Sequence, residues 1–94
     1  MALTKTTEED KIEVVSQYKH IQIRTATVIK DDGVEISRSF HRKVIDPGTL
    51  DASDNLVDTD ISGESTEVQG IAAAVWSTSV KNAWKAKLIA DKSA

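Results

Sequence analysis

Residues 20–45, HIQIRTATVIKDDGVEISRSFHRKVI, decide the fold of this chain. β-branched residues are dense on both sides of Asp32-Gly33, and such runs favour extended strands. The Asp-Gly pair favours a two-residue turn in which both residues take positive φ. The stretch therefore predicts an antiparallel hairpin, with one strand at about 20–30 and the next at 34–45.

The loop of this hairpin has an alternative form, with three residues and Gly33 in a left-handed bulge. The two-residue turn pairs Ile29 with Ile36, whereas the three-residue loop would set Ile29 against Glu35. We favour the two-residue turn because it gathers most of the large apolar side chains on one face. That face would carry Ile21, Ile29, Ile36, Phe40 and Val44.

The same register places Arg38 and Arg42 on the apolar face, where a lone buried guanidinium is costly. Either the third strand contains a bulge, or both arginines reach past the rim of the core to acidic partners. The acidic segment 46–64 is the obvious source of such partners. We expect intramolecular ion pairs there, and we also keep both arginines as candidate interface residues.

The chain before the hairpin predicts one further strand, at about 11–17, with a turn or a bulge around Tyr18 to His20. Residues 1–10 are mostly Thr, Lys, Glu and Asp, which predicts a flexible tail. Residues 11–94 are then expected to form one domain, because a chain of 94 residues suffices for a single modest core.

The chain after the hairpin predicts an acidic loop at 46–64, opened by Asp46-Pro47-Gly48, with a possible short strand around 55–57. Helices are expected at about 65–76 and 78–90. Thr66 with Gln69 suggests a capping box for the first helix, and Ser77-Thr78-Ser79 suggests a cap for the second. One long helix is the alternative. The predicted fold is α+β: a three-stranded antiparallel meander followed by one or two helices packed on one sheet face.

Composition excludes several classes of protein. The chain has no cysteine, which rules out disulfides and thiolate metal sites. Its net charge of −3 argues against a dedicated nucleic-acid binder. We expect no signal peptide, because the first ten residues have no apolar run, and no membrane segment, because no run approaches the ~18–20 apolar residues required.

One segment has the pattern of a cation loop. Residues 58–69 resemble the calcium loop of an EF-hand, with oxygen ligands at alternating positions, Gly63 at the turn, and a helix following. The candidate ligands are Asp58, Asp60, Ser62 and Glu64. Position 12 of the loop is Gln69 where the motif needs a bidentate glutamate, and no helix precedes the loop. We therefore expect no cofactor, and hold a calcium or small-ligand site as an alternative.

No catalytic constellation is visible. Ser37 and Ser39 lie near His41 on the polar face, but no third group orients the histidine. The basic residues of that face could bind nucleic acid, which is a second alternative. They are Lys19, Arg24, His41 and Lys43. The predicted register places no aromatic side chain there, and RNA-binding sheets rely on such side chains for stacking.

Two tryptophans, Trp76 and Trp84, lie eight residues apart in the helical segment. They are expected either to pack on the sheet or to anchor a contact with another protein, and both readings stay open.

The segment IQIRTATVIKDDGVEISRSFHR, Ile21 to Arg42, with Pro47-Gly48 and the Ala-Val-Trp helix after it, resembles a small protein recurrent in tailed phages, notably marine phages and marine metagenomes. The resemblance implies a role in the virion or in its assembly. The expected location is therefore the virion or the cytoplasm of the host cell. It supplies no catalytic residue and no ligand. Our leading hypothesis is a non-enzymatic structural or assembly accessory that binds copies of itself or another phage protein.

Overall fold

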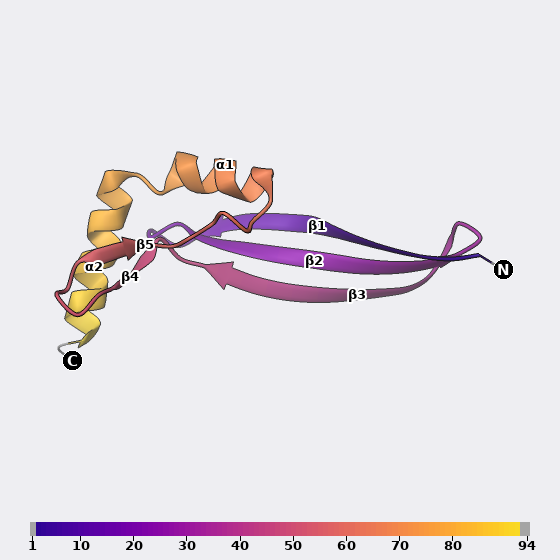
Figure 1. Ribbon diagram of the computed structural model, residues 1–94, viewed down its shortest axis with the longest axis horizontal. Helices are drawn as coiled ribbons and strands as arrows, with labels where there is room; N and C mark the ends of the chain where they lie inside the picture. The colour runs from indigo at the N-terminus through magenta and orange to yellow at the C-terminus, as the bar shows by residue number, and fades with distance from the viewer. Residues whose placement is uncertain (1, 93–94) are drawn as a thin grey trace. The chain divides into compact units, whose positions relative to one another are not determined.

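A computed structural model describes residues 2–92 and confirms the predicted α+β class. An antiparallel three-stranded sheet of order β1-β2-β3 is followed by a two-stranded sheet and two helices (Figure 1). The elements are β1 Leu3–Val15, β2 His20–Asp31, β3 Val34–Ile45, β4 Gly48–Leu50, β5 Leu56–Asp58, α1 Thr66–Val75 and α2 Thr78–Lys92.

The chain divides into two compact units, where the sequence predicted one domain over 11–94. The first unit comprises Met1–Glu13 and Gln22–Val44, and holds most of the three-stranded sheet. The second comprises Val14–Ile21 and Ile45–Ala94, and holds the small sheet and both helices. The packing of the helices on one face of the three-stranded sheet stays a prediction.

The reversal between β2 and β3 has the two-residue form expected from Asp32-Gly33. β2 ends at Asp31 and β3 begins at Val34. Asp32 has φ 51° and Gly33 has φ 84°, so both central residues lie in the left-handed region, as a type I′ turn requires. This turn matches the twist of the two strands that it joins, which explains why both strands extend to its edges.

The N-terminal segment corrects the prediction of a flexible tail at 1–10. β1 begins at Leu3, and near this end the backbone N–H of Asp32 donates to the carbonyl of Ala2 at 2.9 Å. A strand at the edge of an antiparallel sheet is held by backbone hydrogen bonds to its neighbour, so its side chains can be polar throughout. The prediction weighed apolar content and therefore missed this strand.

The buried positions of β2 change parity along the strand. Ile21 and Ile23 are buried, and so are Ala26 and Val28, with two half-buried residues between the pairs. A regular strand alternates with period two, and an interval of three is what one extra residue, a β-bulge, produces. The uniform alternation of buried positions expected for the hairpin therefore does not hold along the whole of β2.

The helices begin with serine caps. Ser65 is the N-cap of α1, and its Oγ accepts the backbone N–H of Val68 at 3.2 Å. The expected capping box at Thr66 is therefore one residue too late. Ser77 caps α2 in the same way, accepting from the N–H of Val80 at 3.3 Å. The prediction of two helices with a tight joint is confirmed, because only Trp76 and Ser77 separate Val75 from Thr78.

The predicted loop 46–64 contains a short hairpin. β4 pairs antiparallel with β5, with Gly48 opposite Asp58 and Leu50 opposite Leu56. Asp51 organises the turn between them, since its Oδ1 accepts the backbone N–H groups of Ser53 and Asn55, both at 2.9 Å. α2 packs against β4 (Figure 1). β4 and β5 have three residues each, and an alternation of apolar and polar residues that short does not predict a pair of strands.

Candidate functional site

The outer strand β3 is the most open element of the first unit. β3 is an edge strand, because the sheet order is β1-β2-β3. Every residue from Val34 to Val44 is exposed. One side of this strand bonds to β2, which leaves a row of backbone N–H and C=O groups along the other side. Such a row is a template for pairing with another chain.

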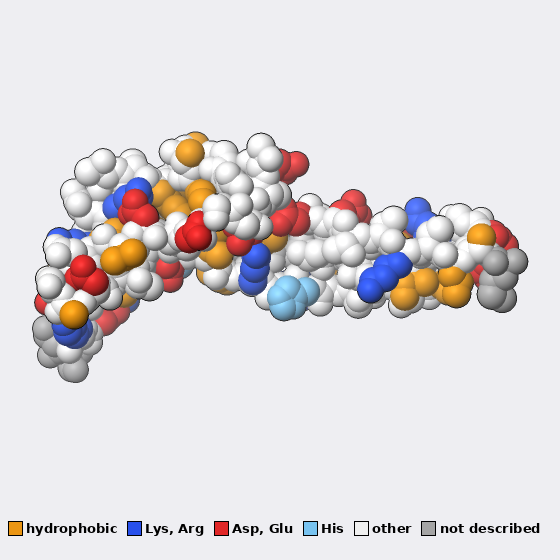
Figure 2. Space-filling model, in the orientation of Figure 1, with side chains coloured by type: hydrophobic (Ala, Val, Ile, Leu, Met, Phe, Trp, Pro, Cys, Tyr) orange, Lys and Arg blue, Asp and Glu red, His pale blue; other side chains and the backbone are white. Residues whose placement is uncertain are grey.

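Apolar side chains lie along this open strand. Val34 is 66% exposed, Ile36 59%, Phe40 44% and Val44 56%. All four occupy even-numbered positions of β3. The sequence predicted that helices would cover these side chains, and on β3 they are exposed. Hydrophobic side chains are visible at the surface near the turn between β2 and β3 (Figure 2).

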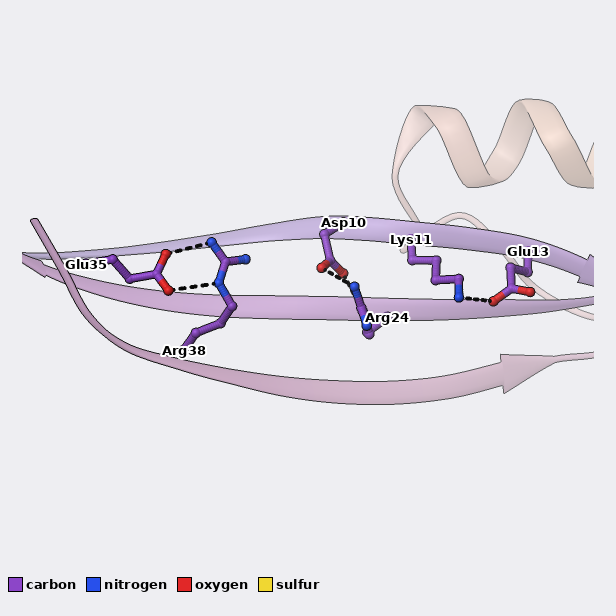
Figure 3. Close-up of polar contacts among 6 residues, drawn as sticks. All are labelled: Asp10, Lys11, Glu13, Arg24, Glu35 and Arg38. Carbon is purple, nitrogen blue, oxygen red and sulfur yellow. Dashed lines mark hydrogen bonds and ion pairs between the residues drawn. The ribbon is translucent and has the colours of Figure 1, made fainter.

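Arg24 connects all three strands of the sheet. Its guanidinium makes two hydrogen bonds to the carboxylate of Asp10 on β1, at 3.0 and 2.7 Å (Figure 3). Its Cζ also lies 4.4 Å from the ring centroid of Phe40 on β3, and Arg42 lies 5.9 Å from the same ring. Phe40 therefore lies beside Arg24, so the prediction that the face of Arg24 carries no aromatic side chain is wrong.

The bond to Arg24, with a smaller coulombic effect of the same residue, lowers the pKa of Asp10 below its ordinary value of 3.8. A depressed carboxyl pKa stabilises the folded state above the unfolded pKa, and this contribution is lost as pH falls through the folded pKa. We expect Asp10→Asn to lower the free energy of unfolding at pH 5, and to have a smaller effect at pH values well below 3.8. Urea unfolding of both proteins at each pH measures this, and an equal difference at both would contradict the assignment.

A pocket of about 170 Å³ opens beside this cluster. Its lining includes four cationic residues, Lys11, Arg24, Arg42 and Lys43, and one acidic residue, Glu13. Lys11 pairs with Glu13 at 2.9 Å, and Arg24 with Asp10 (Figure 3). Of the basic residues proposed for nucleic acid, the pocket brings together Arg24 and Lys43. Lys19 belongs to the second unit, and His41 is exposed on β3 outside the pocket lining.

Arg38 does not reach the acidic segment 46–64 as expected. Its guanidinium bonds to both carboxylate oxygens of Glu35 on its own strand, at 3.2 and 2.8 Å. This bond is the largest cause of the lowered pKa of Glu35. Arg38 extends from β3 toward the other two strands, so the pair lies away from the outer edge (Figure 3). Since β3 is exposed, a guanidinium there costs little desolvation, and no distant partner is required.

The two tryptophans, which the sequence left open between the core and an interface, are both buried. Each is 8% exposed. The indole N–H of Trp76 donates to the carbonyl of Lys19, and that of Trp84 to the carbonyl of Gly48, both at 2.7 Å. A buried indole requires such an acceptor. Each indole therefore links its helical segment to a part of the second unit that is distant in sequence.

In the calcium-like loop, residues 58–69, carboxylate oxygens bind other groups of the protein. Asp58 pairs with Lys81 at 3.2 Å, and Asp60 accepts the backbone N–H of Ser62 at 2.9 Å, which lowers the pKa of Asp60. Among residues 2–92, no group of three His, Asp or Glu side chains is placed to hold a metal ion. Glu64 and Ser62 are thus not gathered with the aspartates into a cation site.

The histidines lie in different units. Nδ1 of His20 lies 3.0 Å from Oγ of Ser16, and its ring lies edge-on to Trp84 with centroids 4.8 Å apart. His20 is half-buried beside Trp84 in the second unit, while His41 is an exposed residue of β3.

Sequence reasoning missed Asp10 and Lys11, because it assigned residue 10 to a tail and treated β1 as starting at 11. The signal that could have found them is the run of threonines at positions 4, 6 and 7, since threonine favours strands. Extension of the strand expected at about 11–17 back through these threonines would have placed Asp10 on it.

None of the described helices is long and apolar enough to cross a membrane. A scan against protein-family models found no match, and searches of curated proteins and of solved structures found no significant match.

Proposed function

We propose that this protein is a non-enzymatic assembly module that associates with copies of itself through the open edge of β3. The observation that carries the proposal is the unbroken exposure of β3 from Val34 to Val44, on an edge strand that presents four large apolar side chains. Open edges and apolar side chains are the two features by which sheets recruit further strands.

The charges on β3 could instead protect the edge from association, because charged side chains on edge strands discourage pairing. Arg38 is neutralised by Glu35, and Arg42 lies near the ring of Phe40. A strand protected from pairing would not also expose Val34 and Ile36 beside those charges. These observations favour association through the edge of β3 over protection of that edge.

The setting that we propose is the assembly of a tailed phage. It rests on the resemblance of the segment Ile21 to Arg42, which contains most of β2 and β3. Homo-oligomers form by repeated contact between identical chains, and closed symmetry is the common result. Nothing in this proposal requires a cofactor or a bound substrate.

Sedimentation equilibrium over a concentration series tests the proposal. We expect the wild-type chain to convert from monomer to oligomer within the micromolar range. Phe40→Lys or Ile36→Lys should raise the dissociation constant at least about tenfold, because central apolar contacts carry most of the binding energy. Val57→Lys, at a 51% exposed position on β5, serves as the control and should leave it unchanged. A wild-type chain that stays monomeric throughout would overturn the proposal.

A further inference from the structure

The pocket of the first unit is shared by all three strands of its sheet. The lining residues are Lys11 and Glu13 of β1, residues 22–24 of β2 and residues 42–44 of β3. An opening that three neighbouring strands line lies over the sheet and not along its outer edge. Pairing of another strand with the edge of β3 therefore does not fill this pocket, and an occupant of the pocket is separate from the contact proposed above.

Most of the charges around the pocket are balanced within the chain. Lys11 pairs with Glu13 at 2.9 Å. Arg24 makes two hydrogen bonds to the carboxylate of Asp10. Lys43 also has a partner. These three cations are therefore not the source of an unbalanced charge.

Arg42 is the cation of the pocket that has no carboxylate partner. Its side chain is exposed, and none of the carboxylates in residues 2–92 is placed to pair with it. Its Cζ lies 5.9 Å from the ring centroid of Phe40, and Cζ of Arg24 lies 4.4 Å from the same centroid. Two guanidinium groups thus lie near one ring, and the carboxylate of Asp10 balances only the charge of Arg24. An anion in the pocket would balance the charge of Arg42.

Hydrogen-bond donors remain at the pocket beside this charge. A guanidinium carries five N–H donors, and Arg24 uses two of them on Asp10. The exposed side-chain amide of Gln22 adds a neutral donor to the lining. The planar fork of Arg42 matches the two oxygens of a carboxylate. The pocket therefore offers one unbalanced positive charge together with several donors.

The size and the charge of the pocket together select the class of ligand. Pockets for drug-sized ligands measure about 300–1,000 Å³, and this one measures about 170 Å³. A phosphate monoester carries a charge of about −1.5 to −2 at neutral pH, more than one guanidinium balances, whereas a carboxylate carries a single charge. Val44, which is 56% exposed, and Ile23 line the same pocket and suit a short aliphatic stem.

We propose that this pocket binds a carboxylate on a short aliphatic stem, held by Arg42 with further hydrogen bonds from Arg24 and Gln22. Two sources supply this chemistry, namely a free short-chain acid and the side chain of a glutamate in another protein. The observation that carries the inference is an unpaired Arg42 in the wall of a pocket that also holds free donors and apolar surface. The inference does not depend on self-association through β3.

A titration of the whole chain with sodium butyrate, followed by NMR spectra of side-chain N–H and methyl groups, tests the proposal. The spectra detect the weak, millimolar binding expected for so small a ligand. We expect saturable shifts at the side chains of Gln22, Arg42 and Val44. Butyramide has the same stem without the charge, and should bind at least about tenfold more weakly, because bonds between charged groups are the stronger ones. Sodium chloride keeps the ionic strength constant throughout.

Two arginine variants separate the pocket from a general attraction of anions. Arg42→Gln should raise the dissociation constant for butyrate at least about tenfold. Arg42→Lys keeps the charge but loses the planar fork, and should fall between that variant and the wild type. Arg38→Gln is the matched control, because Arg38 lies on the same strand, is paired with Glu35 and is outside the pocket lining. It should leave the dissociation constant unchanged. Spectra without ligand check that each variant is folded.

A blocked glutamate, N-acetylglutamic acid α-methylamide, distinguishes the two sources. Tighter binding than butyrate identifies the side chain of another protein, weaker binding identifies a free acid, and either result supports the pocket. The absence of saturable shifts with both probes overturns the inference. Equal binding of butyramide, or equal effects of Arg38→Gln and Arg42→Gln, overturns it as well. Sedimentation reports self-association separately, so each of the two proposals can fail while the other stands.

Discussion

Replacement of Trp84 by alanine should lower the free energy of unfolding by about 3–5 kcal/mol, the range for removal of a large buried aromatic side chain. The ring is 8% exposed and lies against Tyr18 and His20, with centroid distances of 5.3 and 4.8 Å. The substitution also leaves the carbonyl of Gly48 without its donor. Small domains are stable by only about 5–15 kcal/mol, so this loss is a large part of the total.

Urea unfolding followed by circular dichroism measures the effect of Trp84→Ala without depending on tryptophan fluorescence. Trp84→Phe is the milder comparison, because phenylalanine keeps a buried aromatic ring, although a smaller one, and lacks the N–H donor. We expect that control to cost about 1–3 kcal/mol, the penalty for an unsatisfied buried polar group. A loss below about 1 kcal/mol for Trp84→Ala would show that the ring is not a core residue.

Among replacements of a glycine by alanine, Gly48→Ala should lower the stability most, although it adds only one methyl group. A Cβ at Gly48 would lie 2.5 Å from the carbonyl oxygen of Val57 and 3.2 Å from the side chain of Leu56. The first of these atoms belongs to the backbone of β5, so the small hairpin itself must open to accept the methyl group. We expect a loss of about 1–3 kcal/mol, as for overpacked cores.

The same chemical change at Gly70 provides the control, with the opposite sign expected. Gly70 lies within α1, and a Cβ there meets no atom within 4 Å. Because alanine is the better helix former, Gly70→Ala should raise stability by about 0.5–1 kcal/mol. Thermal or urea unfolding of the two variants should therefore shift in opposite directions. A neutral result at Gly48 would mean that β4 and β5 do not approach as closely as described.

Local patterns predicted the hairpin at the centre of the fold well. The strand expected at 34–45 is β3, and the two-residue turn at Asp32 and Gly33 has the positive φ angles that its residues favour. The helices expected at 65–76 and 78–90 differ from α1 and α2 by two residues or fewer at each end. These features depend on interactions between residues close in sequence, so local sequence patterns predict them.

Features that depend on distant residues were predicted less well. Arg38 was expected to need an acidic partner far away, but its position on an exposed edge makes Glu35 sufficient. Trp76 and Trp84 could have been core or interface residues. Their burial depends on carbonyl acceptors at Lys19 and Gly48, which lie 57 and 36 residues away in the sequence.

The sequence by itself determined the strand order of the central hairpin, its turn and the two helices, because turn chemistry, β-branched residues and helix periodicity act over a few residues. Only the tertiary structure decided that β1 begins at Leu3, that the face of β2 changes parity, and that the apolar side chains of β3 stay uncovered. Edge pairing and burial are set by which strands become neighbours. That depends on the free energy of the whole chain, and no short segment encodes it.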